Sequence, residues 1–187
     1  LKVMNKGVTI ESATISMRNF YYAGIMVHTY LMYGFPTQTL QETVDALEIV
    51  RQMFRADLIG SGFWHRYAMT VHSPSGVDPE KYGVKRKNSH VNTFANNEVH
   101  FVEDRGYNVA AAGAALNAAL ANYMAGAELE RPVHKWFAGK APQTAIEPTE
   151  ITDHLIKPDN SRLYNDKARL IWLGVPPVRS EDGIIIN

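Results

Sequence analysis

The sequence predicts an α/β fold in which helices alternate with parallel strands. Residues 9–23 and 39–54 place apolar side chains at three- and four-residue steps, the period of amphipathic helices. A short run rich in β-branched, aromatic and other apolar residues follows each of them. The two runs begin about thirty residues apart, the repeat of a right-handed βαβ unit. With 187 residues, 45% of them hydrophobic, the chain can bury a core of this kind.

The first predicted helix covers residues 9–23. It begins with a threonine, which suits the N-cap, and Gly24 suits the C′ position just beyond the helix. Residues 25–33 are then nearly all β-branched, aromatic or apolar, which favours a central strand covered on both faces. We therefore expect His28 to face the core or a helix. The turn Gly34-Phe35-Pro36 ends this strand.

The second predicted helix begins after Thr39, because Thr39 and Glu42 have the spacing of a capping box. Its apolar stripe consists of Leu40, Val44, Leu47, Val50, Met53 and Phe54. The residues expected on its outer, solvated face are Glu42, Asp45, Glu48, Arg51 and Gln52. A second strand is predicted from Asp57 to about His65, which completes a helix-strand-helix-strand order.

After the second strand this alternation stops. Prolines and glycines mark residues 71–92 as a long loop. The later predicted elements are a strand at 98–103, a helix capped by Asn108 and running to about Glu130, and a strand at 168–173. The alanine-rich part of that helix allows a neighbouring element to approach closely. The apolar tail at 183–186 is expected to be exposed unless it pairs.

The charge balance argues against several partners. The 19 Lys and Arg residues match 19 Asp and Glu residues, so no net field attracts a nucleic-acid backbone, and the basic run at 85–87 is expected to be solvated. Residues 109–127 are mostly alanine with two asparagines, too weakly apolar for a membrane span. The first residues lack the apolar core of a signal peptide. We expect a cytoplasmic protein that binds neither nucleic acid nor membrane.

The amino-acid composition and the missing motifs also exclude several kinds of catalytic and metal site. Without cysteine, these residues alone form no disulfide, no Cys-ligated zinc site, no iron–sulfur cluster and no thiol nucleophile. Glu98, His100 and Glu103 offer nitrogen and oxygen ligands, but no His-Glu-x-x-His motif or aspartate-rich calcium loop supports them, so no metal site is predicted. No Gly-x-Ser-x-Gly elbow and no nucleotide phosphate loop is present either.

Ligands of parallel α/β sheets bind beyond the carboxyl ends of the strands. At and after the end of the second strand stand His65, Arg66 and His72, a cation and two titratable groups suited to anchoring a carboxylate or moving a proton. These three are the candidate catalytic residues, although hydrogen-bonded structural histidines would fit the same positions. The turn at 34–36 either lets backbone approach a planar or phosphate-like ligand or is simply a tight strand-to-helix connection.

Several stretches together resemble the second half of a radical S-adenosylmethionine (SAM) domain. They are residues 2–9 (Lys-Val-Met-Asn-Lys-Gly-Val-Thr), residues 22–27 (Tyr-Ala-Gly-Ile-Met-Val) and residues 30–39 (Tyr-Leu-Met-Tyr-Gly-Phe-Pro-Thr-Gln-Thr). In that family a Lys-x-Met-Asn-Lys-Gly stretch follows the fourth barrel strand, and the fifth strand ends in Gly-Phe-Pro-x-x-Thr. Residues 64–74 resemble the sixth strand and loop of an iron–sulfur oxidoreductase branch, many members of which have an upstream cobalamin-binding domain. The resemblance covers about residues 1–90.

This resemblance implies a partial TIM-like (β/α) barrel fragment with at least two parallel strands. Residues 1–75 would form the second half of the barrel, and residues 76–187 a helical and irregular C-terminal extension. The parent protein would use SAM and a [4Fe-4S] cluster on a Cys-x-x-x-Cys-x-x-Cys motif, and cobalamin is a further cofactor that the branch allows. The residues matched to the fifth-strand motif that packs on the SAM adenine are Leu31, Met32, Gly34, Phe35 and Pro36.

Three functions remain open at this point. The first is the C-terminal part of a radical SAM oxidoreductase, which forms SAM- and substrate-side surface, lacks the cluster cysteines and needs the missing N-terminal half of the barrel as its partner. The second is a non-catalytic α/β binding or interaction module that self-associates through the exposed strand edge, residues 184–186 and the alanine-rich helix. The third is a metal-independent enzyme with His65 or His72 as its base. Half a barrel also predicts that another chain or the C-terminal segment pairs with the open sheet edge.

Overall fold

The computed structural model describes residues 7–87, 97–102, 106–156, 178–180 and 183–185. Within these residues the protein is an α/β structure with five α-helices and a two-stranded parallel sheet, and no closed barrel is formed. Contacts between residues divide the chain into two units, residues 1–157 and residues 158–187. The first unit holds the parallel sheet and the candidate site.

The parallel sheet pairs β1 (His28–Tyr33) with β2 (Ser61–Arg66), and helix α2 (Leu40–Arg55) connects them. This confirms the predicted βαβ unit. Both strands begin a few residues later than predicted, because each preceding helix ends in a left-handed turn, at Gly24 (φ 70°) and at Asp57 (φ 53°). The residues after each turn return the chain from the helix end to the sheet.

The two helix starts are fixed by local hydrogen bonds. Helix α1 (Ile10–Tyr22) is capped by Thr9, whose side chain accepts a hydrogen bond from the Ser12 amide at 3.0 Å. At α2 the Thr39 amide donates to Glu42 Oε2 at 2.7 Å, and the Thr39 hydroxyl oxygen accepts from the Glu42 amide. The capping box predicted at Thr39 is therefore confirmed.

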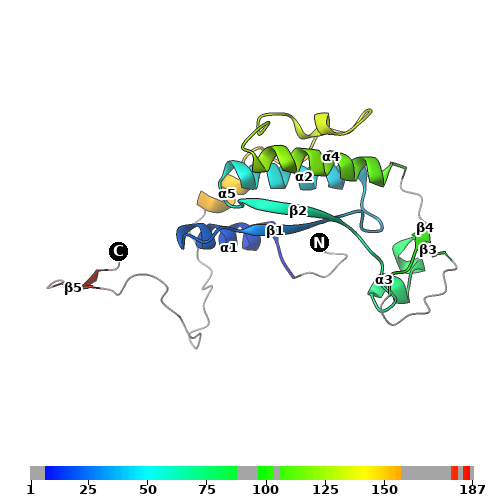
Figure 1. The fold of residues 1–187 in the computed structure, drawn as a ribbon, viewed down its shortest axis with the longest axis horizontal. Coiled ribbons are helices and arrows are strands. Elements are labelled where there is room, and N and C mark those ends of the chain that lie inside the picture. The colour runs from blue at the N-terminus through cyan, green and yellow to red at the C-terminus, as the bar shows by residue number, and fades with distance from the viewer. Residues whose placement is uncertain (1–6, 88–96, 103–105, 157–177, 181–182, 186–187) are drawn as a thin grey trace. The chain divides into compact units, whose positions relative to one another are not determined.

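Helices α2 and α4 (Val109–Met124) pack against each other on one face of the sheet (Figure 1). Small residues allow α4 to approach the sheet closely. Gly113 of α4 lies against the Tyr33 ring of β1, and Gly62 of β2 lies near Leu120 of α4. The close packing expected of the alanine-rich helix is confirmed. The helix ends at Met124, before the predicted residue 130, since the chain turns at Gly126 (φ 69°).

The main hydrophobic core lies between this face of the sheet and the helices. Its largest buried members include Val44, Leu47, Phe54, Trp64, Leu116, Leu120, Tyr123 and Ile151. Helix α5 (Glu150–Ile156) packs against α1 and α2, and a 3-10 turn, η2 (Val133–Trp136), packs against α2 and α4. The chain beyond α4 thus returns over the helical layer.

The prediction of a solvated outer face on α2 is wrong for Glu48 and Gln52, which are only 3% and 5% exposed. Glu48 accepts two hydrogen bonds from the Arg51 guanidinium, at 2.6 and 2.8 Å. Gln52 Nε2 donates to the Glu147 carbonyl at 2.8 Å, and Gln52 Oε1 accepts from the Ile151 amide at 3.1 Å. Residues 147–151, which belong to the chain that returns after α4, cover this face and bind its polar groups.

A small cluster of elements follows β2. It contains α3 (Pro74–Val77), η1 (Glu80–Tyr82), β3 (Lys85–Arg86) and β4 (Phe101–Val102) around the buried side chains of Met69, Val84 and Val99. The described part of the predicted loop at 71–92 therefore holds regular elements. Strand β4 pairs antiparallel with β3 and is shorter than the predicted strand at 98–103.

In the second unit, β5 (Val178–Ser180) and β6 (Gly183–Ile185) pair antiparallel with each other. The pairing of the open sheet edge with another chain or with the C-terminal segment stays a prediction. The predicted strand at 168–173 lies outside the described residues. No helix in the described part of the chain is long and apolar enough to cross a membrane.

Candidate functional site

Among the described residues, helices cover one face of the parallel sheet and not the other. Side chains of Thr29, Leu31 and Tyr33 alternate with those of His28, Tyr30 and Met32, as the strand geometry requires. The first set faces α2 and α4. The second set, with its cross-strand partners, forms an aromatic face that consists of His28, Tyr30, Met32, Ser61, Phe63 and His65. Tyr30 is 69% and Phe63 50% exposed, so the prediction of a strand covered on both faces is wrong.

Side chains of the aromatic face contact one another across the two strands. The Tyr30 ring lies 5.9 Å from the Phe63 ring and 5.5 Å from the His65 ring, measured between centroids. His28 Nδ1 and Ser61 Oγ are hydrogen-bonded at 2.8 Å. His28 is thus exposed on this face and does not face the core, contrary to the sequence prediction. No described helix or strand lies over this face, and Tyr30 and Phe63 stay exposed on it.

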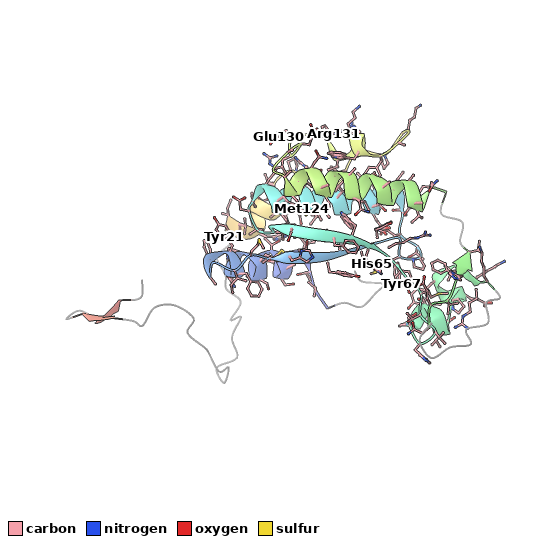
Figure 2. All side chains as sticks on the ribbon, viewed as in Figure 1. Tyr21, His65, Tyr67, Met124, Glu130 and Arg131 are labelled. Carbon is pink, nitrogen blue, oxygen red and sulfur yellow. The ribbon has the colours of Figure 1, made fainter. Side chains whose placement is uncertain are left out.

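A cleft of about 620 Å³ opens at the carboxyl end of β2. His65 and Arg66 reach it from the strand, Lys87 and His100 from the segments beside β3 and β4, and the first residues of α4 close another side. Figure 2 shows His65 and Tyr67 at this end of β2, with Glu130 and Arg131 on the far side of the helical layer. The volume is in the range of small-molecule pockets.

Backbone hydrogen bonds hold the segments that bring Lys87 and His100 to the cleft. The Lys87 amide donates to the His100 carbonyl at 2.8 Å, and the Val99 amide donates to the Met69 carbonyl at 2.7 Å. An isolated bridge joins Thr70 and Glu98. The cleft walls are therefore connected to the end of β2 by antiparallel pairing.

The three candidate catalytic residues do not lie together. His65 and Arg66 both line the cleft, as their place at the end of the strand predicted. His72 is exposed and lies outside the cleft lining. The chain turns back between Thr70 and Ser73, whose amide donates to the Thr70 carbonyl at 3.1 Å, and this turn takes His72 away from the end of the strand.

The five residues matched to the adenine motif also divide between different surfaces. Met32 lies on the aromatic face, whereas Leu31 packs against the main core and Pro36 is fully buried. The Phe35 ring packs edge-on against Tyr67, with centroids 4.9 Å apart. Gly34 takes a left-handed φ of 75°, and its amide donates to Gln38 Oε1 at 2.7 Å.

Sequence reasoning missed Tyr30, Phe63 and Lys87 as site residues. The signal for the first two was present, because Tyr30 and Phe63 occupy the positions that alternate with core residues in their strands. No local signal placed Lys87 beside the strand end, since it arrives there through pairing with a segment more than ten residues further along the chain.

No group of three or more His, Asp or Glu side chains that could hold a metal ion occurs among the described residues. The chain has no cysteine, so its own residues do not fit a [4Fe-4S] cluster. The aromatic face does offer ring surface on which a planar group could stack.

Comparisons of the chain with protein-family models, with curated proteins and with solved structures found no match.

Proposed function

We propose that the chain is the C-terminal part of a radical SAM iron–sulfur oxidoreductase and forms the SAM and substrate side of a partial (β/α) barrel. The motifs at 2–9, 30–39 and 64–74 support this assignment. The single observation that favours it most is the uneven cover of the β1–β2 pair, with helices on one face and exposed aromatic side chains on the other. In a (β/α) barrel the helices lie outside and the opposite face of each strand lines the interior.

In this proposal the aromatic face is part of the barrel interior. Tyr30 and Met32 are the residues that contact the adenine of SAM, because both lie on this face and Tyr30 exposes its ring. Leu31 packs on the core side of the strand, Gly34 provides the left-handed turn that ends it, and Pro36 is buried just beyond this turn. SAM and the cluster, with cluster ligands supplied upstream, provide the hydrogen-abstraction chemistry.

The proposal names three partners. The first is the N-terminal half of the barrel, whose strands would pair with the free edge of the β1–β2 sheet and cover the aromatic face. The second is a substrate that enters at the carboxyl ends of the strands. An upstream cobalamin-binding domain is the third, since the branch that residues 64–74 resemble often contains one.

The test uses the protein that includes the segment upstream of this chain, reconstituted with iron and sulfide without oxygen. With a reductant and SAM we expect it to release 5′-deoxyadenosine, and we expect Tyr30→Ala to weaken SAM binding. Tyr22→Ala is the matched control, because Tyr22 is an exposed tyrosine of helix α1 and not part of the aromatic face. Absence of 5′-deoxyadenosine from a protein that has its cluster would contradict the proposal.

A second candidate is a non-catalytic module that self-associates, and the exposure of Tyr30 and Phe63 favours it. Two copies would then cover each other's aromatic faces. Light scattering on the 187-residue chain separates the candidates: a dimer that Tyr30→Ser and Phe63→Ser together convert to a monomer supports the module. A monomer at all concentrations counts against association as the function.

A further inference from the structure

The cleft at the end of β2 has an excess of hydrogen-bond donors and positive charge. Among the described residues that line it, Arg66 and Lys87 are accompanied by one carboxylate, that of Glu98, and the imidazoles of His65 and His100 add further nitrogen atoms. Neither Arg66 nor Lys87 forms an ion pair with another side chain in the described parts of the protein. Both cations are exposed and therefore available to a ligand.

The helix that closes the cleft adds to this polarity. Asn108 caps α4 through Oδ1, which accepts from the Ala111 amide at 3.0 Å. The amides of Val109 and Ala110, which also line the cleft, belong to the first turn and have no partner within the helix. Their partial positive charge supplements the Arg66 and Lys87 cations.

The rest of the lining is apolar ring and aliphatic surface. Tyr67 and Phe101 pack together with ring centroids 6.3 Å apart. The Tyr67 hydroxyl is hydrogen-bonded to Ser75, and the Tyr107 hydroxyl donates to the Gln38 carbonyl at 3.2 Å. Because both hydroxyls are already engaged, these tyrosines offer a ligand their rings and not their polar ends.

We infer that this cleft binds a small amphipathic oxyanion. Arg66 and Lys87 hold its carboxylate or phosphate group, and Tyr67 and Phe101 contact its aromatic or aliphatic body. An oxyanion matches the forked donors of Arg66 better than a neutral ligand does, and removing apolar surface from water adds affinity. A neutral or cationic ligand would bring no negative charge to the two cations, which outnumber the Glu98 carboxylate.

This inference goes beyond the proposed function. It requires neither SAM nor a cluster, and its test needs only the 187-residue chain. If the cleft binds no anion, the proposed radical chemistry is not contradicted. If the upstream cysteines are absent, the proposed anion site is not contradicted.

The test measures binding of phenyl phosphate, benzoate and neutral benzyl alcohol by titration calorimetry. We expect at least one of the two anions to bind about tenfold more tightly than benzyl alcohol, and its affinity to fall as salt is added. The tighter anion identifies the group as phosphate or carboxylate. Equal affinity for all three ligands, or no binding of either anion, overturns the inference.

Two substitutions assign the binding to the cleft. Arg66→Gln and Lys87→Gln are each expected to weaken binding of the preferred anion about fivefold to tenfold. The matched controls, Arg55→Gln and Lys81→Gln, remove exposed cations that do not line the cleft and are expected to leave affinity unchanged. Circular dichroism checks that each variant is folded. Equal weakening by the controls would show a general charge effect and overturn the assignment.

A last arm tests the apolar part of the ligand. Inorganic phosphate and acetate carry the same anionic groups without a body and are expected to bind more weakly than phenyl phosphate and benzoate. If the bare anions bind as tightly as their phenyl derivatives, Tyr67 and Phe101 do not contact the ligand and the amphipathic assignment is overturned.

Discussion

Tyr30 and His65 lie on neighbouring parallel strands with their rings 5.5 Å apart and inclined by 30°. Their contact is on the sheet face opposite α2 and α4, where Tyr30 is exposed. A group of exposed aromatic side chains on a sheet face is typical of a surface that binds a ligand or another part of a protein. This relationship is the physical basis for the proposal that the face belongs to a larger barrel.

Adjacent aromatic residues of β2 test which face is the core. We expect Trp64→Ala to lower the free energy of unfolding by about 3–5 kcal/mol, because Trp64 is buried in the main core. Phe63→Ala, on the aromatic face, is expected to cost less than about 1 kcal/mol. Urea unfolding of both variants gives the comparison. Similar losses for the two would contradict the one-sided cover of the sheet.

Gly113 tests the close approach of α4 to the sheet. In an exposed helix, replacing glycine with alanine stabilises by about 1 kcal/mol. At Gly113 the added Cβ would overlap the Tyr33 ring, so we expect Gly113→Ala to destabilise the protein by about 1–3 kcal/mol instead. Thermal unfolding measures the change.

The same substitution in a Tyr33→Leu variant shows whether overlap with the Tyr33 ring causes the loss of stability. With Tyr33→Leu already present, Gly113→Ala should lose most of its cost, because the leucine side chain is shorter. The helix-propensity control is Ala114→Gly, on the exposed side of α4, which should cost about 1 kcal/mol in either background. An equal cost of Gly113→Ala with and without the Tyr33 ring would exclude this explanation.

Substitution of Gln52 tests how residues 147–151 are attached to α2. We expect Gln52→Ala to destabilise the protein by about 1–3 kcal/mol, because it leaves the Glu147 carbonyl and the Ile151 amide without their partner. Hydrogen exchange at the Ile151 amide should accelerate. Gln143→Ala, at an exposed position shortly before these residues, is the control and should change neither quantity. An unchanged Ile151 exchange rate in Gln52→Ala would refute the contact.

Tyr123 predicts a loss of stability in alkali. Burial raises its pKa to about 12, from an ordinary value of 10.0, and its hydroxyl makes no hydrogen bond of normal geometry to a described residue. Between pH 10 and 12 the unfolded chain therefore loses this proton while the folded chain keeps it, so folded stability falls as the pH rises through this range.

The phenylalanine variant isolates that contribution. Tyr123→Phe should cost less than about 1 kcal/mol at neutral pH and should show a shallower decline in stability above pH 10. Tyr22→Phe, at an exposed position, should follow the unsubstituted protein at every pH. Parallel stability curves for Tyr123→Phe and the unsubstituted protein would mean that Tyr123 is not the group responsible.

Local interactions made part of the fold predictable. Thr39 and Glu42 stand three residues apart, and Asn108 is three residues from the amide that it caps, so both helix starts follow from the sequence. The burial of Gln52 could not be predicted, because its partners Glu147 and Ile151 lie 95 and 99 residues further along the chain. Nothing near Gln52 distinguishes it from a solvated glutamine.

Some residues of the candidate site could likewise be predicted from the sequence, and others could not. Strand topology predicts that His65 and Arg66 lie at the mouth of the sheet, and both line the cleft. His72 departs because a turn that begins at Thr70 redirects the chain. His100 joins the cleft through antiparallel pairing, whose register no local pattern specifies.

The sequence encoded upstream of this chain tests the central claim most directly. If the aromatic face lines a radical SAM barrel, four further βα units precede the chain, and a Cys-x-x-x-Cys-x-x-Cys motif is expected within about the preceding two hundred residues. Determination of that sequence with this motif in place is the result that the account predicts. An upstream sequence of that length without the three cysteines would contradict it.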